Sequence, residues 1–139
     1  MAALLALALA GYFARWVLAM DRGSDTMVSI SNSIREGAYA FMRREYTWVA
    51  VFVVVLAALI AILLPAGGWK AAAYVFGAML SGVAGFIGMR IATAANSRTT
   101  EAARTGGTAL ALPVAFRGGA VMGFTGAGLG LLGIGLGFW

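Results

Sequence analysis

Hydrophobic and polar residues follow one another in long blocks along this chain. Four blocks are almost wholly apolar, at about residues 2–20, 46–64, 71–95 and 118–139. A helix needs roughly 17–25 apolar residues to cross a bilayer, and each block is long enough. The pattern therefore predicts an all-α integral membrane protein with four transmembrane helices, which form a single transmembrane region over residues 1–139.

The first apolar block is interrupted only by Arg15, whose long side chain can extend toward the nearer membrane interface. A cleaved signal peptide is the alternative interpretation of this block. Such a peptide begins with basic residues, and the chain has none before Arg15. A retained membrane helix is therefore favoured.

Residues 21–45 form a polar segment between the first two spans. Ser24, Asp25 and Thr26 offer side-chain oxygens that cap a helix starting near Met27. Apolar residues then recur every three or four positions, which predicts an amphipathic helix. No helix-breaking residue follows Phe41, so we expect this extension to run on into the second span. The apolar positions are Met27, Ile30, Ile34, Ala38 and Phe41.

The third and fourth spans are rich in small residues. Pro65, Gly67 and Gly68 are expected to form the chain's only short turn ahead of them, because Pro stops a helix and Gly permits a reversal. Small residues four positions apart let membrane helices approach closely. We therefore predict a close contact between these spans, made by Gly77, Ser81 and Gly85 on one and by Gly119, Gly123, Gly126 and Gly130 on the other.

One glycine pattern resembles a nucleotide-binding motif. Gly128, Gly130 and Gly133 satisfy the GxGxxG spacing, but the dinucleotide fingerprint needs a preceding strand and a later acidic residue. Neither is present here. Helix packing is the favoured interpretation.

The charges indicate how the chain is oriented. Of the ten basic residues, nine flank residues 21–45 and 96–117, and only Lys70 lies beside the Pro65 turn. Positive charge is enriched on the cytoplasmic side of membranes, so we expect these two segments to be cytoplasmic and both termini to be non-cytoplasmic. The nine are Arg15, Arg22, Arg35, Arg43, Arg44, Arg90, Arg98, Arg104 and Arg117. Their spread along the chain argues against nucleic-acid binding and for contact with lipid headgroups.

The titratable residues argue against catalysis by this chain. It has no Cys and no His, and its five acidic residues are scattered through the polar segments at Asp21, Asp25, Glu36, Glu45 and Glu101. Ion relays and magnesium sites need carboxylates at membrane depth or in clusters. We therefore expect no catalytic, cofactor-binding or metal-binding residue.

Four further arginines, at three places in the chain, have a structural interpretation. Arg90, in the third span, is expected to reach the cytoplasmic face as a structural residue. Residues 35–36 and 43–45 are expected to be solvated or to form interhelical ion pairs, rather than to bind phosphate.

Several sequence runs are similar to the ion-translocating membrane pyrophosphatases. The first is Ile34-Arg35-Glu36-Gly37-Ala38, followed by Ala40-Phe41 and Arg44-Glu45-Tyr46. The later runs occur in the same order as in that family and cover most of the chain: Ser81 to Thr93, Ala95-Asn96, Arg98-Thr99, Glu101-Ala102-Ala103-Arg104, Val114-Ala115-Phe116-Arg117 and Gly119-Ala120-Val121-Met122-Gly123.

This resemblance implies a homodimeric pump with sixteen helices per subunit, which hydrolyses magnesium pyrophosphate at the cytoplasmic side and moves protons or sodium ions outward. The chain resembles the first four helices, in the outer ring. The substrate and ion-gate residues of the family lie on later helices, so no catalytic residue is carried over. The resemblance implies Mg²⁺ as the cofactor of the full-length enzyme, the remaining helices as partners, and the bacterial inner membrane as location.

The alternative is an autonomous small four-span protein, either exporter-like or a structural subunit. A small exporter is expected to carry a carboxylate inside the membrane, and these spans have none. The choice between protons and sodium ions, and any dependence on potassium, rest on positions outside this chain.

Overall fold

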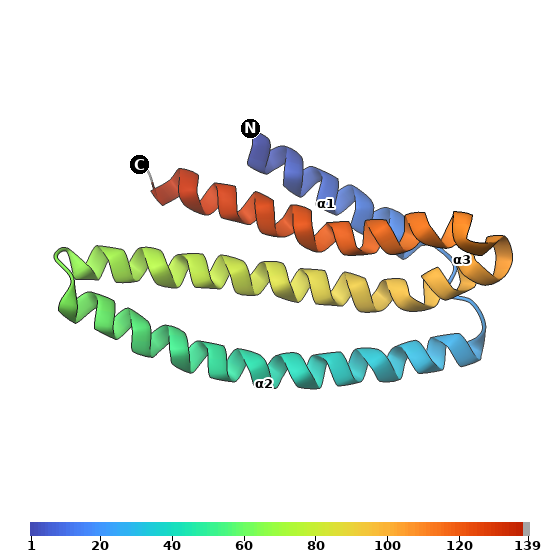
Figure 1. The fold of residues 1–139 in the computed structure, drawn as a ribbon, viewed down its shortest axis with the longest axis horizontal. Coiled ribbons are helices and arrows are strands. Elements are labelled where there is room, and N and C mark those ends of the chain that lie inside the picture. The colour runs from blue at the N-terminus through green and yellow to red at the C-terminus, as the bar shows by residue number, and fades with distance from the viewer. Residues whose placement is uncertain (138–139) are drawn as a thin grey trace.

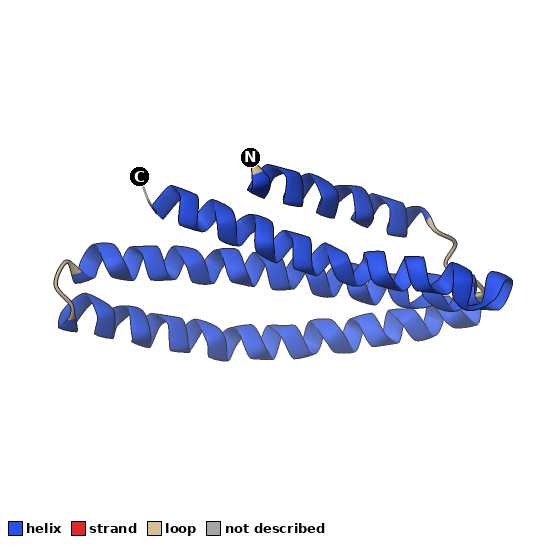
Figure 2. Cartoon of the chain, turned by 45° about the horizontal axis from the view of Figure 1, so that its top comes forward, coloured by secondary structure: helices blue, strands red, loops and turns tan. Residues whose placement is uncertain are grey.

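The structure, a computed structural model that describes residues 1–137, is a bundle of long helices (Figure 1, Figure 2). They are α1 (Ala2–Ala19), α2 (Asp25–Leu63) and α3 (Gly67–Gly137). Helix α3 is interrupted at Gly106 and Gly107, whose backbone angles are not helical, and the chain reverses there. We call residues 67–105 its first arm and residues 108–137 its second arm. The prediction of an all-helical protein is confirmed for the described residues.

Helix α2 begins where the capping residues predict. Ser24 is the residue before the helix, and its hydroxyl accepts a hydrogen bond from the backbone N–H of Met27 at 3.4 Å. Asp25 in the first turn adds a favourable interaction with the helix dipole. From there the helix runs without a break for 39 residues. The amphipathic extension and the second apolar block are therefore one helix, as expected.

The turn after α2 differs from the prediction. The residue with positive φ is Ala66, at 54°, whereas Gly67 and Gly68 already belong to α3. Gly67 is buried, and a side chain there would collide with the backbone of Ile60 and Ala61. Glycine at 67 thus permits a close approach of the two helices and does not make the reversal itself.

The expectation of only one short turn is also wrong. Gly107 has φ 63° and ψ −159°, a backbone conformation that essentially only glycine adopts. It lets the helix reverse inside the second polar segment. Up to that point the first arm continues as helix through residues 96–105, beyond the predicted end of the apolar block.

The two arms of α3 pack along stripes with alternating spacings of four and three residues. On the first arm the buried stripe is Ala84, Gly88, Ile91, Ala95 and Arg98, and on the second it is Val114, Gly118, Val121, Thr125 and Gly128. At their ends these stripes also meet α1, since Arg98 bonds to Leu18 and Gly128 lies against Leu7. A spacing that averages 3.5 residues stays on one face of neighbouring helices, as in coiled coils. Added Cβ atoms at Gly88 and Gly118 would meet Met122 and Ala95 of the opposite arm.

The predicted contact surface is therefore wrong in its register. An added Cβ would meet nothing within 4 Å at Gly77, or at Gly119, Gly123, Gly126 and Gly130. Gly85 faces the Tyr46 hydroxyl of α2 instead. An interval of exactly four residues advances about 40° around the helix at each step, so it leaves the contact face. The predicted positions Gly77, Ser81, Gly126 and Gly130 line an open groove of about 440 Å³ between the arms.

Helix α1 packs on α3 and makes no contact with α2. Its buried residues are Ala3, Ala10 and Val17, seven positions apart. Gly128 of the second arm lies against Leu7 and the carbonyl of Ala3. Small residues on both helices thus allow the close approach that association in lipid requires.

The outer surface of the bundle is apolar. In α2, Trp48, Phe52 and Ile62 are between 63% and 78% exposed. All three helices are long and apolar enough to cross a membrane. Such a continuous apolar surface needs lipid or other helices to cover it. The chain is therefore an integral membrane protein.

Candidate functional site

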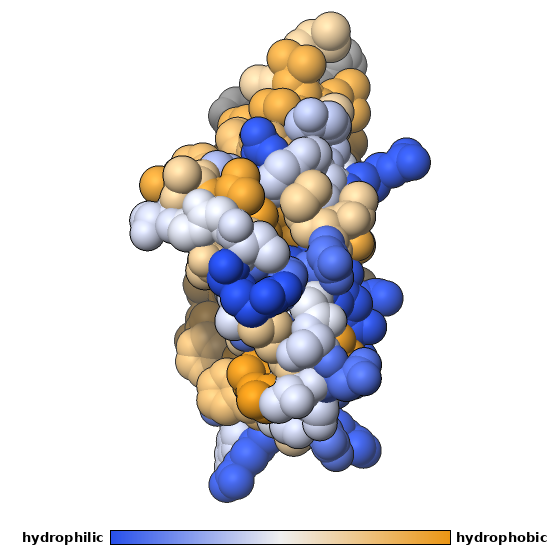
Figure 3. Space-filling model, turned by 90° about the vertical axis from the view of Figure 1, so that its right-hand side faces the viewer, coloured by the Kyte–Doolittle hydropathy of each residue, from blue (hydrophilic) through white to orange (hydrophobic). Residues whose placement is uncertain are grey.

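Hydrophilic residues gather at one end of the bundle, where α1 joins α2 and where α3 reverses (Figure 3). We call this region, residues 20–25 and 96–109, the polar end. The turn between α2 and α3 lies at the opposite end, the second arm of α3 runs back toward it, and the shorter α1 begins part-way along the bundle (Figure 1). Both polar segments of the sequence therefore meet on one side of the apolar bundle.

Arg98 joins α1 to the first arm at the polar end. Its guanidinium donates from Nη1 to the carbonyl of Ala94 at 2.6 Å and from Nη2 to the carbonyl of Leu18 at 3.1 Å. The Leu18 carbonyl belongs to the last turn of α1, where carbonyls lack helical partners and a cation is favourable. Arg98 is 9% exposed, and burial lowers its pKa from the ordinary value, with Arg22 and Arg35 adding to the effect. The guanidinium nevertheless keeps its charge near neutral pH.

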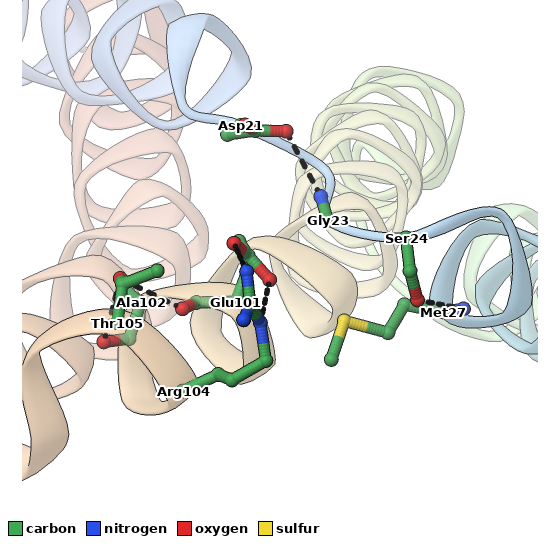
Figure 4. A network of polar contacts seen from close by, with 8 residues as sticks. All are labelled: Asp21, Gly23, Ser24, Met27, Glu101, Ala102, Arg104 and Thr105. Carbon is green, nitrogen blue, oxygen red and sulfur yellow. Dashed lines mark hydrogen bonds and ion pairs between the residues drawn. The ribbon is translucent and has the colours of Figure 1, made fainter.

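Glu101 lies one turn beyond Arg98 and pairs with Arg104 (Figure 4). The Arg104 Nε and Nη2 atoms donate to the two carboxylate oxygens at 2.8 and 2.6 Å. These hydrogen bonds lower the pKa of Glu101 below its ordinary value and raise that of Arg104. The Glu101 side chain also lies against Gly23, which has a φ of +78° that favours glycine, and an added Cβ there would lie 2.6 Å from the Met27 sulfur. The Glu101–Arg104 pair thus packs against the segment that joins α1 to α2 and holds this segment on α3.

The start of α2 carries a second arginine cluster. Arg22 and Arg35 both donate to the side-chain oxygen of Asn32, at 3.3 and 3.2 Å. Within residues 1–137 the one ion pair is that of Glu101 and Arg104. Residues 35–36 and 43–45 are therefore solvated, and the interhelical ion pairs considered for them do not form. Arg90 is likewise exposed on the first arm.

A cavity of about 540 Å³ opens beside the polar end, between the end of α1 and the start of the second arm. Arg117 lies on its wall and stacks its guanidinium on the Trp16 ring, 3.9 Å from the ring centroid. Phe13 lies further off, with its ring centroid at 5.9 Å from the guanidinium carbon. Sequence reasoning did not pair Trp16 with Arg117, because the two are far apart along the chain and only the packing of α1 on the second arm brings them together.

The acidic residues do not form a metal site. Asp21, Asp25, Glu36 and Glu45 are exposed, and both carboxylate oxygens of Glu101 are held by Arg104. Over the described residues, no three His, Cys, Asp or Glu side chains lie close enough to hold a metal ion. The donor set therefore does not fit Mg²⁺, which prefers several oxygen ligands in octahedral geometry.

The GxGxxG pattern lies within the second arm of α3. Gly128 packs against α1, and an added Cβ at Gly133 would touch Leu80 of the first arm at 3.1 Å. No strand precedes the motif, because residues 108–137 are helical. The packing interpretation is confirmed for these two glycines, although Gly130 has no close neighbour.

Over the described residues, these features define an all-helical membrane protein in which Arg22, Arg98 and Arg104 lie at one polar end of the bundle. Residues 4–139 match the family described as inorganic H+ pyrophosphatase. The chain belongs to this family.

Individual relatives agree with the family match. The chain is 45% identical, over 133 residues, to the K(+)-insensitive pyrophosphate-energized proton pump of Methanosarcina mazei, covering 96% of this chain and 20% of that protein. It is 40% identical, over 124 residues, to the putative K(+)-stimulated pyrophosphate-energized sodium pump of Clostridium tetani, covering 88% of this chain and 18% of that protein. The chain thus spans about a fifth of the length of these relatives.

Proposed function

We propose that this chain is the N-terminal, membrane-embedded part of a pump that couples pyrophosphate hydrolysis to outward transport of protons or sodium ions. The observation that carries this proposal is the family match over residues 4–139, supported by 45% identity to a proton pump over 96% of the chain. The apolar bundle with a single polar end is compatible with such a role. Because sodium and proton pumps are both among the relatives, the transported ion stays open.

Within the pump we assign this chain a structural role, with no catalytic, cofactor-binding or metal-binding residue. Pyrophosphate hydrolysis of this kind uses metal ions to neutralise phosphate charge, and the acids of residues 1–137 do not fit such a site. Mg²⁺ would therefore be held by the rest of the protein.

The assembly we propose follows the family resemblance. Helices α1 and α2 and the two arms of α3 would be four spans in the outer ring of a sixteen-helix subunit, and two subunits would form the pump. The exposed apolar surface of α2 leaves room for lipid and for further helices. We place the protein in the bacterial inner membrane, with the polar end cytoplasmic and both termini on the other side.

Two measurements test the proposal. Inverted membrane vesicles that contain the protein at its full natural length should acidify, or take up sodium, when pyrophosphate and Mg²⁺ are added. The 139-residue chain alone in proteoliposomes should release no phosphate above background. Transport driven by another substrate would reject the pump, and robust hydrolysis by the chain alone would reject its structural role.

The alternative is an autonomous four-span protein. It is distinguished by the reading frame beyond Trp139. A frame that continues into Asp-rich segments supports the pump, and a stop codon at that point supports the alternative.

A further inference from the structure

The cavity beside the polar end combines positive charge with an apolar wall. Its volume is about 540 Å³, and its charged lining residues are Arg98, Arg117, Asp21 and Glu101. Its apolar wall includes Trp16, Leu110 and Pro113. Both carboxylate oxygens of Glu101 are already paired with Arg104 (Figure 4), so the two lining arginines are opposed by the carboxylate of Asp21 alone. A ligand that fits such a cavity has an anionic head and an apolar body.

The two arginines that line the cavity are held in place by the protein. Arg98 is nine-tenths buried, and its Nη atoms donate to backbone carbonyls while its Nε atom has no partner. The guanidinium carbon of Arg117 lies over the Trp16 ring, 3.9 Å from its centroid, and the guanidinium makes no hydrogen bond to any residue in the described range 1–137. A guanidinium that is stacked on a ring keeps its N–H edge free and is well suited to bind a phosphate with two parallel hydrogen bonds.

The position of the cavity indicates a membrane lipid as the source of the anion. Arg117 directly precedes the fourth apolar block, and Trp16 lies near the end of the first, so both are placed at the depth of a membrane interface. Leu110 on the cavity wall is 55% exposed, as a residue in contact with an acyl chain would be.

We propose that this cavity binds the phosphodiester headgroup of a membrane phospholipid. Arg117 donates to the phosphate, Arg98 adds positive potential from the cavity wall, and the acyl chains run along Leu110 and Pro113. Bound there, the lipid bridges the end of α1 and the second arm. The proposal depends on the membrane location of the chain and not on its pump activity.

Photo-crosslinking in the native membrane tests the site. A benzophenone amino acid replaces Leu110, or replaces Leu112 as the matched control, in the protein at its full natural length. Leu112 is 64% exposed but does not line the cavity. After irradiation we expect a phospholipid adduct at position 110, identified by mass spectrometry, and its yield should fall at least fivefold in Arg117→Gln while the adduct at 112 is unchanged.

Three controls define the remaining outcomes. Arg90→Gln, which removes an exposed arginine elsewhere on α3, should leave the adduct at 110 intact. Arg117→Lys should retain part of it. The proposal is overturned by a protein adduct or no adduct at 110, by equal loss at 110 and 112 in Arg117→Gln, or by displacement of the adduct with millimolar inorganic phosphate, which would indicate a free-anion site.

Discussion

Two adjacent glycines of the second arm should respond in opposite ways to the same substitution. A Cβ at Gly118 would lie 2.8 Å from the Cβ of Ala95 on the first arm, whereas a Cβ at Gly119 meets nothing within 4 Å. Both residues are helical. Replacing either by Ala therefore brings the same gain in helix propensity, about 1 kcal/mol, and only Gly118→Ala creates a collision.

The size of the effect follows from the geometry. Carbon atoms in contact prefer about 3.5–4.0 Å, so Gly118→Ala must separate the two arms by roughly 1 Å. Neither colliding atom can rotate away, because each Cβ is fixed to its backbone. Overpacking of this kind costs about 1–3 kcal/mol. The propensity gain is common to both variants, so Gly118→Ala should be less stable than Gly119→Ala by about 1–3 kcal/mol.

The difference in stability between the two variants is measured on the 139-residue chain in mixed micelles. The fraction of denaturing detergent is increased, and circular dichroism monitors the loss of helix. Gly119→Ala should be at least as stable as the unchanged chain. If the two variants unfold at the same detergent concentration, or in the reverse order, the arms do not meet along the stripe that contains Gly118.

The remaining predictions concern the polar end and the orientation of the chain. Arg98→Met should weaken the docking of α1 by roughly 1.5–3 kcal/mol, because it removes the one charged hydrogen bond of Arg98 to α1, at the Leu18 carbonyl. Amide exchange should become faster in α1 but not in the second half of α2. Arg104 lowers the pKa of Glu101 below the ordinary value of 4.5, so the folded state gains stability from the ionised pair. This gain is fully present above pH 4.5 and is lost as the pH falls through the lowered pKa. Thermal unfolding measured from about pH 6 to pH 3 should show the loss, and Glu101→Gln should reduce this pH dependence. Since the chain has no Cys, an impermeant thiol reagent on intact cells should label Gly68→Cys, at an exposed position of the Pro65 turn, and not Thr100→Cys. The reverse result would invert the proposed orientation.

The sequence predicted the elements that depend on local patterns. The helix start at Ser24 follows from a side chain that bonds three residues ahead, and the continuity of α2 follows from the absence of a breaker. Both signals lie within a few residues of the feature that they predict. The turns at Ala66 and at residues 106–107 were harder to predict from the sequence. Ala66 has a positive φ that its residue type disfavours, and the glycine pair at 106–107 was not recognised as a reversal inside the polar segment.

Contacts between helices were predicted least well. The sequence shows many small residues in the fourth block, but it does not show which face of the helix they occupy once two arms wrap around each other. The spacing of four predicts a contact through Gly119 and Gly123, whereas the arms meet at Gly88 and Gly118, which belong to stripes with alternating spacings of four and three. The contact between Arg98 and Leu18 depends on the same packing and has no local signal in the sequence.

The exclusive packing of α1 on α3 has a consequence for the order of events during synthesis. Leu18 and its partner Arg98 are 80 residues apart, and at about 5–20 residues per second the ribosome needs roughly 4–16 s to make the intervening chain. During this interval α1 has entered the bilayer but has no surface to dock on, because α2 makes no contact with it. Helix α1 must therefore wait as a single inserted helix, shielded by lipid or by the insertion machinery, until both arms of α3 have been made.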